Sequence, residues 1–249
     1  MHSRDSLKGS AVFARTLIPR MLVKRSPILY RPLNRIRNAV RRSGNLPRLA
    51  SDDVEICVEG YPSSANSFAV NVLRAARPGL RISSHHHAIA NIKIAIRLGI
   101  PCVALIRPPE DAIASRVSRF GTSPRVAISE YCDMHEFLSQ RRANMLIASF
   151  RTVTEDTDRF LDLVSAYAPD VLGPDFARPE PEGIREDMEA WFVDNELEIG
   201  LPSGQRKTRI AQARQELESH ALWQRAKRSY DAVLPWADAL PDPTPTRRR

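Results

Sequence analysis

The feature that most constrains this chain is a series of short apolar segments, each followed by a segment with helical periodicity. Three of these segments show no sustained alternation between apolar and polar residues: "VEICVEG" at 54–60, "PCVALIR" at 101–107 and "NMLIASF" at 144–150. Strands of that kind, separated by helices, are typical of a parallel sheet covered on both faces. We therefore predict an α/β fold in which residues 54–60, 101–106 and 144–149 are parallel strands of one sheet.

The segments between these strands indicate where helices begin and end. "NSFAVNVLRAAR" predicts a helix that begins at or near Asn66, and "AIANIKIAIRLG" predicts one that ends at Gly99. "LRISSHH" predicts a further strand, and "PEDAIASRVSRF" and "SPRVAISEYCDMHEFLSQRRA" predict two more helices. A single helix is expected over "TVTEDTDRFLDLVSAYA", with Thr154 or a neighbour as its cap.

The C-terminal part changes character. Residues 168–204 hold ten acidic and two basic residues, and we interpret them as a mobile connection with one short helix near "IREDMEAWFV". One long helix is expected from "RKTRIAQ" onward. We divide the chain into a basic arm over residues 1–50, an α/β domain over 51–236 and a disordered tail over 237–249.

The net charge of +8 is a property of the arm. Residues 1–50 hold twelve Lys and Arg and one acidic residue, so the other 199 residues sum to −3. That distribution argues against nucleic-acid binding by the domain. The arm has two interpretations. It is either a solvated, partly disordered extension, broken by Pro19, Pro27 and Pro32 and removable without loss of the sheet, or a helix lying on an anionic membrane or an acidic partner.

No segment approaches the roughly 20 apolar residues that cross a bilayer. The three cysteines, Cys57, Cys102 and Cys132, are scattered and odd in number, which is typical of reduced thiols. We expect a cytoplasmic protein without a metal site, and the arm leaves peripheral membrane association open.

Three polar segments follow predicted strands: "GYPSSANS", "SSHHH" and "RPPEDAIAS". Ligands of parallel sheets bind at the carboxyl ends of the strands, and a helix N-terminus attracts anions there. "GYPSSANS" departs from the nucleotide-binding pattern G-x-x-x-x-G-K-[ST], because Ala65 and Asn66 stand at the glycine and lysine positions. Taken alone, a serine-rich turn of this kind also fits a plain helix cap.

Together the three segments resemble the sulfotransferase family, whose donor is 3′-phosphoadenosine 5′-phosphosulfate. "YPSSANSF" at 61–68 is similar to the family's Y-P-K-S-G-T-T-W, and "RPPEDAIAS" at 107–115 is similar to R-N-x-x-D-x-x-x-S. Between them the family has K-x-H where this chain has "HHH" at 85–87. The resemblance implies a three-layer sandwich with a central mostly parallel sheet, similar to the P-loop NTPases.

The resemblance also implies a set of donor-binding residues. Backbone N–H groups of Ser64, Ala65, Asn66 and Ser67 would bind the 5′-phosphate, and Phe68 would stack on adenine. Arg107 and Ser115 would bind the 3′-phosphate, with a structural ion pair as the alternative role for Arg107. Arg206 and Lys207, in "LPSGQRKTRIAQ", are loosely similar to the family's R-K-G element. They also fit a basic helix start on a solvated face.

The family's catalytic lysine corresponds to Ser63, which carries no charge. Aligning K-x-H with "HHH" makes His87 the base and His85, protonated, the substitute cation. Counting back from Arg107 without gaps makes His85 the base instead, so both assignments stay open. In an extended segment His85 and His87 share one face and His86 the other. The alternative is a polar strand end with exposed histidines, and three adjacent residues cannot converge on one metal.

These residues favour a sulfotransferase that moves a sulfonate to a hydroxyl or amine of a small-molecule, carbohydrate or lipid acceptor, without a metal. One alternative is a P-loop kinase-like phosphotransferase. Another is a catalytically inactive nucleotide-binding module recruited by its basic arm, which the uncharged Ser63 favours.

Overall fold

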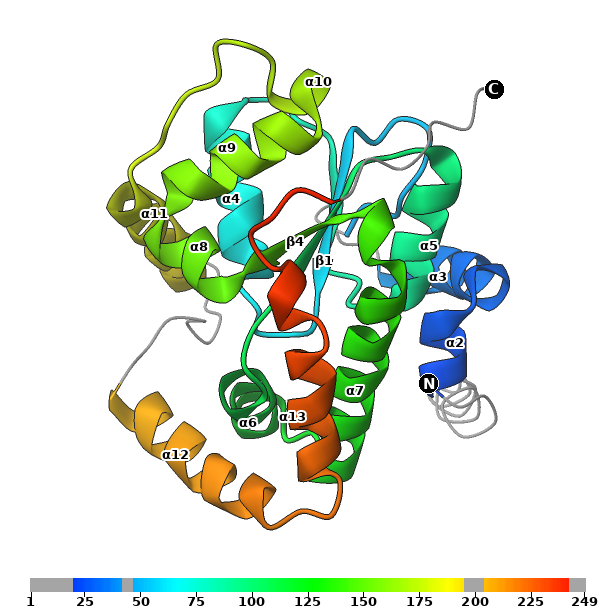
Figure 1. The fold of residues 1–249 in the computed structure, drawn as a ribbon, viewed down its shortest axis with the longest axis vertical. Coiled ribbons are helices and arrows are strands. Elements are labelled where there is room, and N and C mark those ends of the chain that lie inside the picture. Colours follow the sequence, from blue (N-terminus) through cyan, green and yellow to red (C-terminus); the bar gives the residue numbers. More distant parts are fainter. Residues whose placement is uncertain (1–19, 42–46, 195–203, 242–249) are drawn as a thin grey trace, which may run out of the picture.

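The computed structural model describes residues 20–41, 47–194 and 204–241, and its centre is a four-stranded parallel sheet (Figure 1). The strands are β1 (Ile56–Gly60), β2 (Ile82–Ser84), β3 (Cys102–Ile106) and β4 (Leu146–Ser149), in the spatial order β2-β1-β3-β4. Every pairing within the sheet is parallel. The prediction of three parallel strands in one sheet is confirmed, and the protein is an α/β protein whose sheet is flanked by helices.

The helices fill the connections between strands and extend to both ends of the described chain. In chain order they are α2 (Arg20–Arg25), α3 (Pro27–Arg41), α4 (Asn66–Ala76), α5 (Ile89–Leu98), α6 (Pro109–Phe120), α7 (Pro124–Arg141), α8 (Phe150–Glu155), α9 (Thr157–Tyr167), α10 (Pro169–Leu172), α11 (Pro181–Asp194), α12 (Gly204–Glu218) and α13 (Trp223–Asp231), with 3-10 turns at Arg142–Asn144 and Leu234–Trp236. None of the helices in the described ranges is long and apolar enough to cross a membrane.

The two faces of the sheet belong to two apolar clusters, because successive side chains of a strand point to opposite faces. Val58 and Leu105 pack with α4 and α9 on one face. Cys57, Ala104 and Ile106 pack with α5 and α7 on the other. Strands buried on both faces explain why their sequences lack polar alternation.

Several helix boundaries follow the sequence closely. Helix α4 begins at Asn66, and α5 ends at Gly99, whose φ of 70° is the left-handed conformation that glycine adopts readily. The single helix expected over 152–168 is wrong. It is split into α8 and α9 at Asp156, whose carboxylate accepts the N–H of Arg159. Thr154 is not a cap, since its hydroxyl donates to the Phe150 carbonyl within α8.

The C-terminal predictions need larger corrections. The expected long helix is two helices, α12 and α13, which contribute the buried Leu217 and Trp223 to a cluster with α6 and α7. The helix expected near residues 184–193 is confirmed as α11, but Ile184 and Met188 attach it to the main core, and the connection also contains α10. The expected tail is ordered at its start, because the Asp238 N–H donates to the Ile147 carbonyl of β4. Residues 242–249 lie outside the described ranges.

The basic arm packs on the domain over residues 20–41, so the expectation of a solvated, disordered extension is wrong there. Pro27 begins α3, and Pro32 lies inside it without ending it. The hydroxyl of Tyr30 lies 3.0 Å from Nδ1 of His86, and the Tyr30 side chain is buried against the start of α5. Figure 1 places α2 and α3 beside α5 and α7. Residues 1–19 and 42–46 are not described.

Gly60 ends β1 at a point of close contact with β3. A Cβ there would lie 2.5 Å from the Leu105 carbonyl oxygen. We expect Gly60→Ala to lower the free energy of unfolding by about 1–3 kcal/mol, the range for overpacking a core. Urea denaturation measures this. Gly183→Ala in α11 is the matched control, since no atom lies within 4 Å of its Cβ position, and it should be neutral or stabilising. Equal effects of the two variants would contradict this reading of Gly60.

Candidate active site

The loop between β1 and α4 has an unusual backbone. Ser63 and Ala65 have φ values of 69° and 67°, whereas Ser64 between them does not have a positive φ. Alternation of this kind is typical of backbone turns that bind anions through successive N–H groups. The N–H of Ser64 itself donates to the Tyr61 carbonyl at 3.2 Å. Ala65 is also the N-cap of α4, and no side chain caps that helix. Ala65, which stands at the glycine position of the nucleotide-binding pattern, thus has the left-handed backbone that glycine adopts readily. For a residue other than glycine this conformation costs about 1–2 kcal/mol.

Two polar side chains of this loop are buried with unmet hydrogen-bonding capacity. The hydroxyl of Ser64 and Oδ1 of Asn66 have no hydrogen-bond partner among the described residues. The other end of the Asn66 amide is fixed, because Nδ2 donates to the Tyr61 carbonyl at 3.1 Å. Buried polar atoms without partners are rare in folded proteins and are typical of functional sites.

Ser63 joins this loop to the third polar segment. Nη1 of Arg107 donates to the Ser63 carbonyl at 2.8 Å, and the Ser115 hydroxyl donates to the Ser63 hydroxyl at 3.1 Å. Arg107 follows β3, and Ser115 lies two turns into α6. The structure therefore brings the two residues predicted to bind the 3′-phosphate, Arg107 and Ser115, into contact with Ser63, the residue at the family's lysine position.

The guanidinium of Arg107 is held on several sides. It lies 4.0 Å from the centre of the Phe150 ring, which follows β4, and its Nε is 3.8 Å from a carboxylate oxygen of Asp111. The Tyr131 hydroxyl donates to the Arg107 carbonyl at 2.6 Å. The ion pair that was the alternative role for Arg107 is thus present, on the same side chain that contacts the loop.

The histidine segment is not an extended strand end. β2 stops at Ser84, and His85 and His87 have positive φ values of 63° and 47°. The Glu59 carboxylate, at the end of β1, accepts the backbone N–H groups of His86 and His87 at 3.1 and 2.8 Å. The prediction of an extended segment is therefore wrong. The His85 and His87 rings still lie close together, with 6.3 Å between their centres.

Each of the three rings has a different partner. His85 lies between the Ser67 hydroxyl, 3.0 Å from Nε2, and the Ser84 hydroxyl, 2.6 Å from Nδ1. His87 donates from Nδ1 to the Gly60 carbonyl at 2.8 Å, so its neutral ring keeps a basic Nε2. His86 turns away to Tyr30 and takes no part in this group.

Burial controls the protonation of these groups. It lowers the pKa of His87 to about 3, against the opposing effect of the Gly60 carbonyl. Burial, and then the nearby Arg74, also lower the pKa of His85. A neutral His87 suits the role of base, but a protonated His85 is disfavoured, so the expectation of His85 as the substitute cation is not supported.

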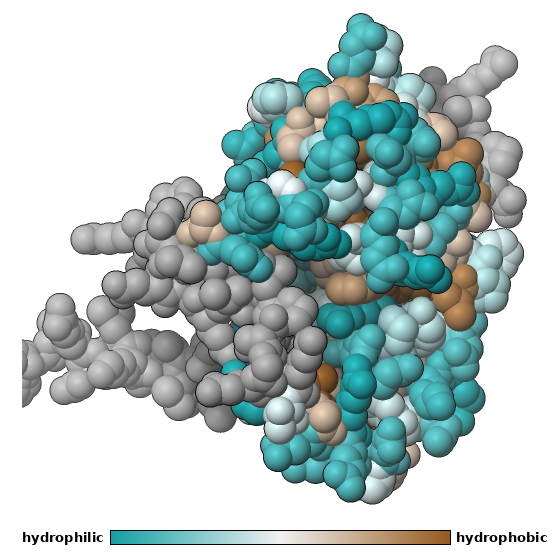
Figure 2. All heavy atoms as spheres, turned by 90° about the vertical axis from the view of Figure 1, so that its left-hand side faces the viewer, coloured by the Kyte–Doolittle hydropathy of each residue, from teal (hydrophilic) through white to brown (hydrophobic). Residues whose placement is uncertain are grey.

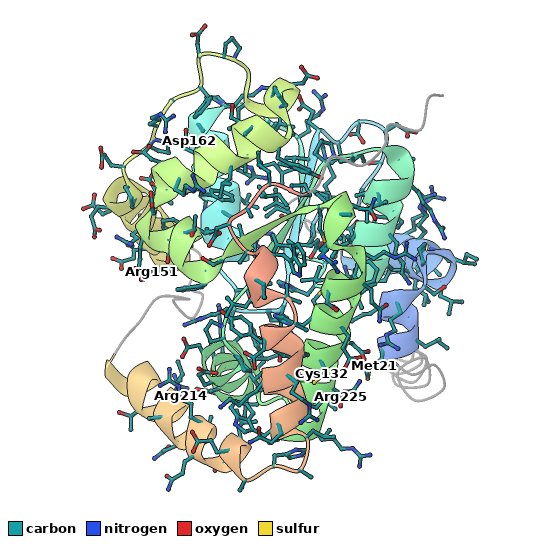
Figure 3. The ribbon with its side chains drawn as sticks, in the orientation of Figure 1. Met21, Cys132, Arg151, Asp162, Arg214 and Arg225 are labelled. Carbon is teal, nitrogen blue, oxygen red and sulfur yellow. The ribbon has the colours of Figure 1, made fainter. Side chains whose placement is uncertain are left out.

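A small cavity lies beside the His87 ring. Its lining comes from the loop, α2 and α7, and includes Tyr61, Pro62, Lys24, Glu130 and Asp133. Met21 of α2 is directed toward α7 at this point (Figure 3). Lys24 pairs with Glu130 at 3.2 Å and Arg25 with Asp133 at 2.6 Å, so the arm forms one wall of the cavity.

The remaining predicted residues lie elsewhere. Phe68, in the first turn of α4, is buried in the core cluster, with the Arg185 guanidinium 5.8 Å from its ring centre, so the expected stacking on adenine is not supported. Arg206 and Lys207 fall in the first turns of α12, where the side chains lie outside what the structure describes.

Sequence reasoning missed Glu59, Asn91, and Lys24 and Arg25 of α2. Glu59 is buried, and burial raises its pKa to about 7 against the effect of the N–H donors around it, including Nδ2 of Asn91 at 2.9 Å. The available signal was a carboxylate inside an otherwise apolar strand, because such a group needs partners when buried.

Comparisons with known proteins give no family: no family model, no curated protein and no solved structure matches the chain.

The lowered pKa of His87 predicts a loss of stability in acid. Below the ordinary histidine pKa of 6.5 the unfolded chain takes up a proton that the buried ring does not, so stability falls as pH falls toward 3. His87→Asn keeps a donor for the Gly60 carbonyl but cannot titrate. From about pH 6.5 to about pH 5, the parent should lose about 2 kcal/mol more than this variant.

Urea denaturation across that pH range measures the difference. Parallel slopes for parent and His87→Asn would show that the His87 ring titrates as it does in the unfolded chain.

Proposed function

We propose that this protein is a sulfotransferase that takes a sulfonate from 3′-phosphoadenosine 5′-phosphosulfate and transfers it to a hydroxyl or amine. The observation that carries the proposal is the meeting of Arg107 and Ser115 at Ser63. Arg107 and Ser115 lie 44 and 52 positions after Ser63 in the sequence, and both contact it in a loop whose backbone is typical of anion-binding sites. The finer fold assignment, a three-layer sandwich similar to the P-loop NTPases, belongs to the same proposal and is supported by helices on both faces of the sheet.

In this proposal the donor's two phosphates occupy neighbouring sites. The 5′-phosphate binds the N–H groups of the first turn of α4, where the helix dipole favours an anion. The Ser64 hydroxyl is close enough in sequence to supply a side-chain donor, and no described residue forms a hydrogen bond with it. The 3′-phosphate binds Arg107 and Ser115, because a guanidinium and a hydroxyl can bind one phosphate group together. The phosphates have no need of a metal when backbone N–H groups and a guanidinium neutralise them.

In this proposal the acceptor reaches His87 through the small cavity beside the ring, which at about 20 Å³ has room for a hydroxyl or amine group and not for a whole acceptor molecule. Nε2 of the neutral ring takes the proton of the acceptor as its oxygen or nitrogen forms a bond to sulfur. The bond between sulfur and the bridging oxygen breaks, and its electron pair stays on the departing phosphate. Because burial depresses the basicity of His87, the proton leaves late, as the new bond forms. The charge on the bridging oxygen is met by the loop N–H groups, next to the uncharged Ser63.

A binding-only module is the second candidate. It is favoured by the absence of charge at Ser63 and by the lowered pKa of His85, which together leave the bridging oxygen without the cation the family uses. The kinase-like alternative is weaker, because Asn66 stands where the nucleotide-binding pattern has lysine. Turnover with donor and a panel of acceptors separates the first two candidates.

Donor binding depends on Arg107. Titration calorimetry with adenosine 3′,5′-bisphosphate in a chelator should give metal-free binding, and Arg107→Ala should weaken it by about 1.5–3 kcal/mol, the value for hydrogen bonds to charged groups. Ser115→Ala should cost less. Arg151→Ala, an exposed arginine on α8, is the control. Parent-like affinity in folded Arg107→Ala and Ser115→Ala would remove the 3′-phosphate assignment.

Turnover depends on Ser63 and His87. Ser63→Lys places a cation where the family has one and should raise the rate, since one donor aimed at developing charge is worth roughly 10²–10³ in rate. His87→Asn should abolish transfer while leaving bisphosphate affinity unchanged. If Ser63→Lys folds and binds donor but gains nothing, and His87→Asn loses nothing, the binding-only module is the better description.

A further inference from the structure

A groove on the side of the molecule away from α11 combines positive charge with exposed apolar side chains. It lies where the start of α3 and the end of α2 meet α5 and α7. The lining residues on which the argument depends are Leu22, Arg25, Ile28, Lys93, Arg97 and Arg141. Both the arm and the domain contribute to it, so it is a property of the folded chain and not of the arm alone.

The groove is a cluster of cations. Four basic side chains line it, and no acidic residue does. Arg25 has a carboxylate partner in Asp133, but neither Arg97 nor Arg141 forms an ion pair with a described residue. Burial, followed by Arg25, Arg141 and Arg97, lowers the pKa of Lys93. The cations therefore repel one another, and a bound anion would relieve that repulsion.

Apolar side chains extend from the mouth of the groove along α3. Leu22 is 52% exposed, Ile28 80% and Ile36 61%. Ile28 and Ile36 are eight residues apart, close to two helical turns and therefore on one face, with the exposed Pro32 between them. Residues 20–41 contain seven Lys and Arg and no Asp or Glu. A helix pair with exposed isoleucines among arginines is typical of a segment that lies in a membrane interface.

The chemistry of this face favours an anionic lipid surface over other partners. A nucleic acid would bind the cations but would leave the exposed leucine and isoleucines without a partner. Residues 1–19 have the same sign of charge as the groove, with three Lys and Arg and one Asp, so they do not complement it. The two sides of the molecule differ in hydropathy, because the face on the α8–α11 side is mostly hydrophilic (Figure 2).

We propose that α2, α3 and this groove dock the protein on an anionic membrane. Leu22, Ile28 and Ile36 enter the boundary between headgroups and acyl chains. Lys93, Arg97 and Arg141 bind lipid phosphates at the surface. The proposal does not depend on the sulfotransferase assignment.

Vesicle co-sedimentation of the full chain tests it. The protein should bind vesicles of phosphatidylcholine mixed with phosphatidylglycerol, should not bind phosphatidylcholine alone, and should bind less as salt is raised. Arg97→Glu with Arg141→Glu should lower the partition coefficient by on the order of tenfold or more, since each basic residue near the surface contributes about fivefold. Lys227→Glu with Arg228→Glu, on the exposed side of α13, is the charge-matched control and should bind like the parent.

Ile28→Ser separates the lipid from other anions. It should weaken vesicle binding while leaving its salt dependence in place. Binding that is equal on both kinds of vesicle, or that is insensitive to the double charge reversal, overturns the proposal. So does a single-stranded RNA that binds the parent, loses affinity on the double reversal and ignores Ile28→Ser. A dimer in sedimentation velocity that the double reversal dissolves would instead assign this face to a second copy of the chain.

Discussion

The buried carboxylate of Glu59 is the group on which the geometry of the candidate site depends. At the end of β1 it accepts the N–H groups of His86 and His87 and the amide of Asn91. These contacts hold the chain after β2 in a left-handed turn that an isolated histidine pair would not adopt, because left-handed backbone costs L-residues about 1–2 kcal/mol. The turn brings His87 back to the Gly60 carbonyl and His85 to the Ser67 hydroxyl at the start of α4. One carboxylate thus sets the position of the proposed base relative to the proposed phosphate loop.

The same edge of the sheet gathers groups from β1, β3 and β4. Ser63 follows β1, Arg107 follows β3, and the Phe150 ring that packs on Arg107 follows β4. Parallel strands make this convergence possible, since their carboxyl ends lie side by side. Helix α7 links this edge to the rest of the molecule. Its Glu130 and Asp133 face the cavity beside His87, while Arg141 at its end lines the basic groove. Lys24 and Arg25 bind α2 to α7 between those two places, so the arm is part of both surfaces.

The sheet could be predicted from the sequence because its strands are buried on both faces, and burial of that kind leaves a simple apolar pattern. The convergence of Ser63, Arg107 and Ser115 could be predicted too, since strand order and motif spacing placed them at one edge.

Other features depend on contacts between distant residues. The histidine turn needs Glu59, and the packing of the arm needs Glu130 and Asp133. A carboxylate in an apolar strand signals that Glu59 has buried partners, but the local sequence does not show which residues these are. The split at Asp156 has a sequence signal, because aspartate is a common N-cap whose carboxylate accepts the backbone N–H of the third residue after it. The apolar pattern continues across Asp156, however, and predicts a single helix. Phe68 was misplaced because its position in the motif suggested a ligand contact, whereas its place on the inner face of α4 made it a core residue.

The most direct test of the account is a crystal structure of the full chain grown with adenosine 3′,5′-bisphosphate. The account predicts one phosphate at the backbone N–H groups of Ala65 to Ser67 and the other at Arg107 and Ser115, with the His87 ring still donating to the Gly60 carbonyl. A bisphosphate bound elsewhere on the protein, with the loop, Arg107 and Ser115 unchanged and free of ligand, would contradict it.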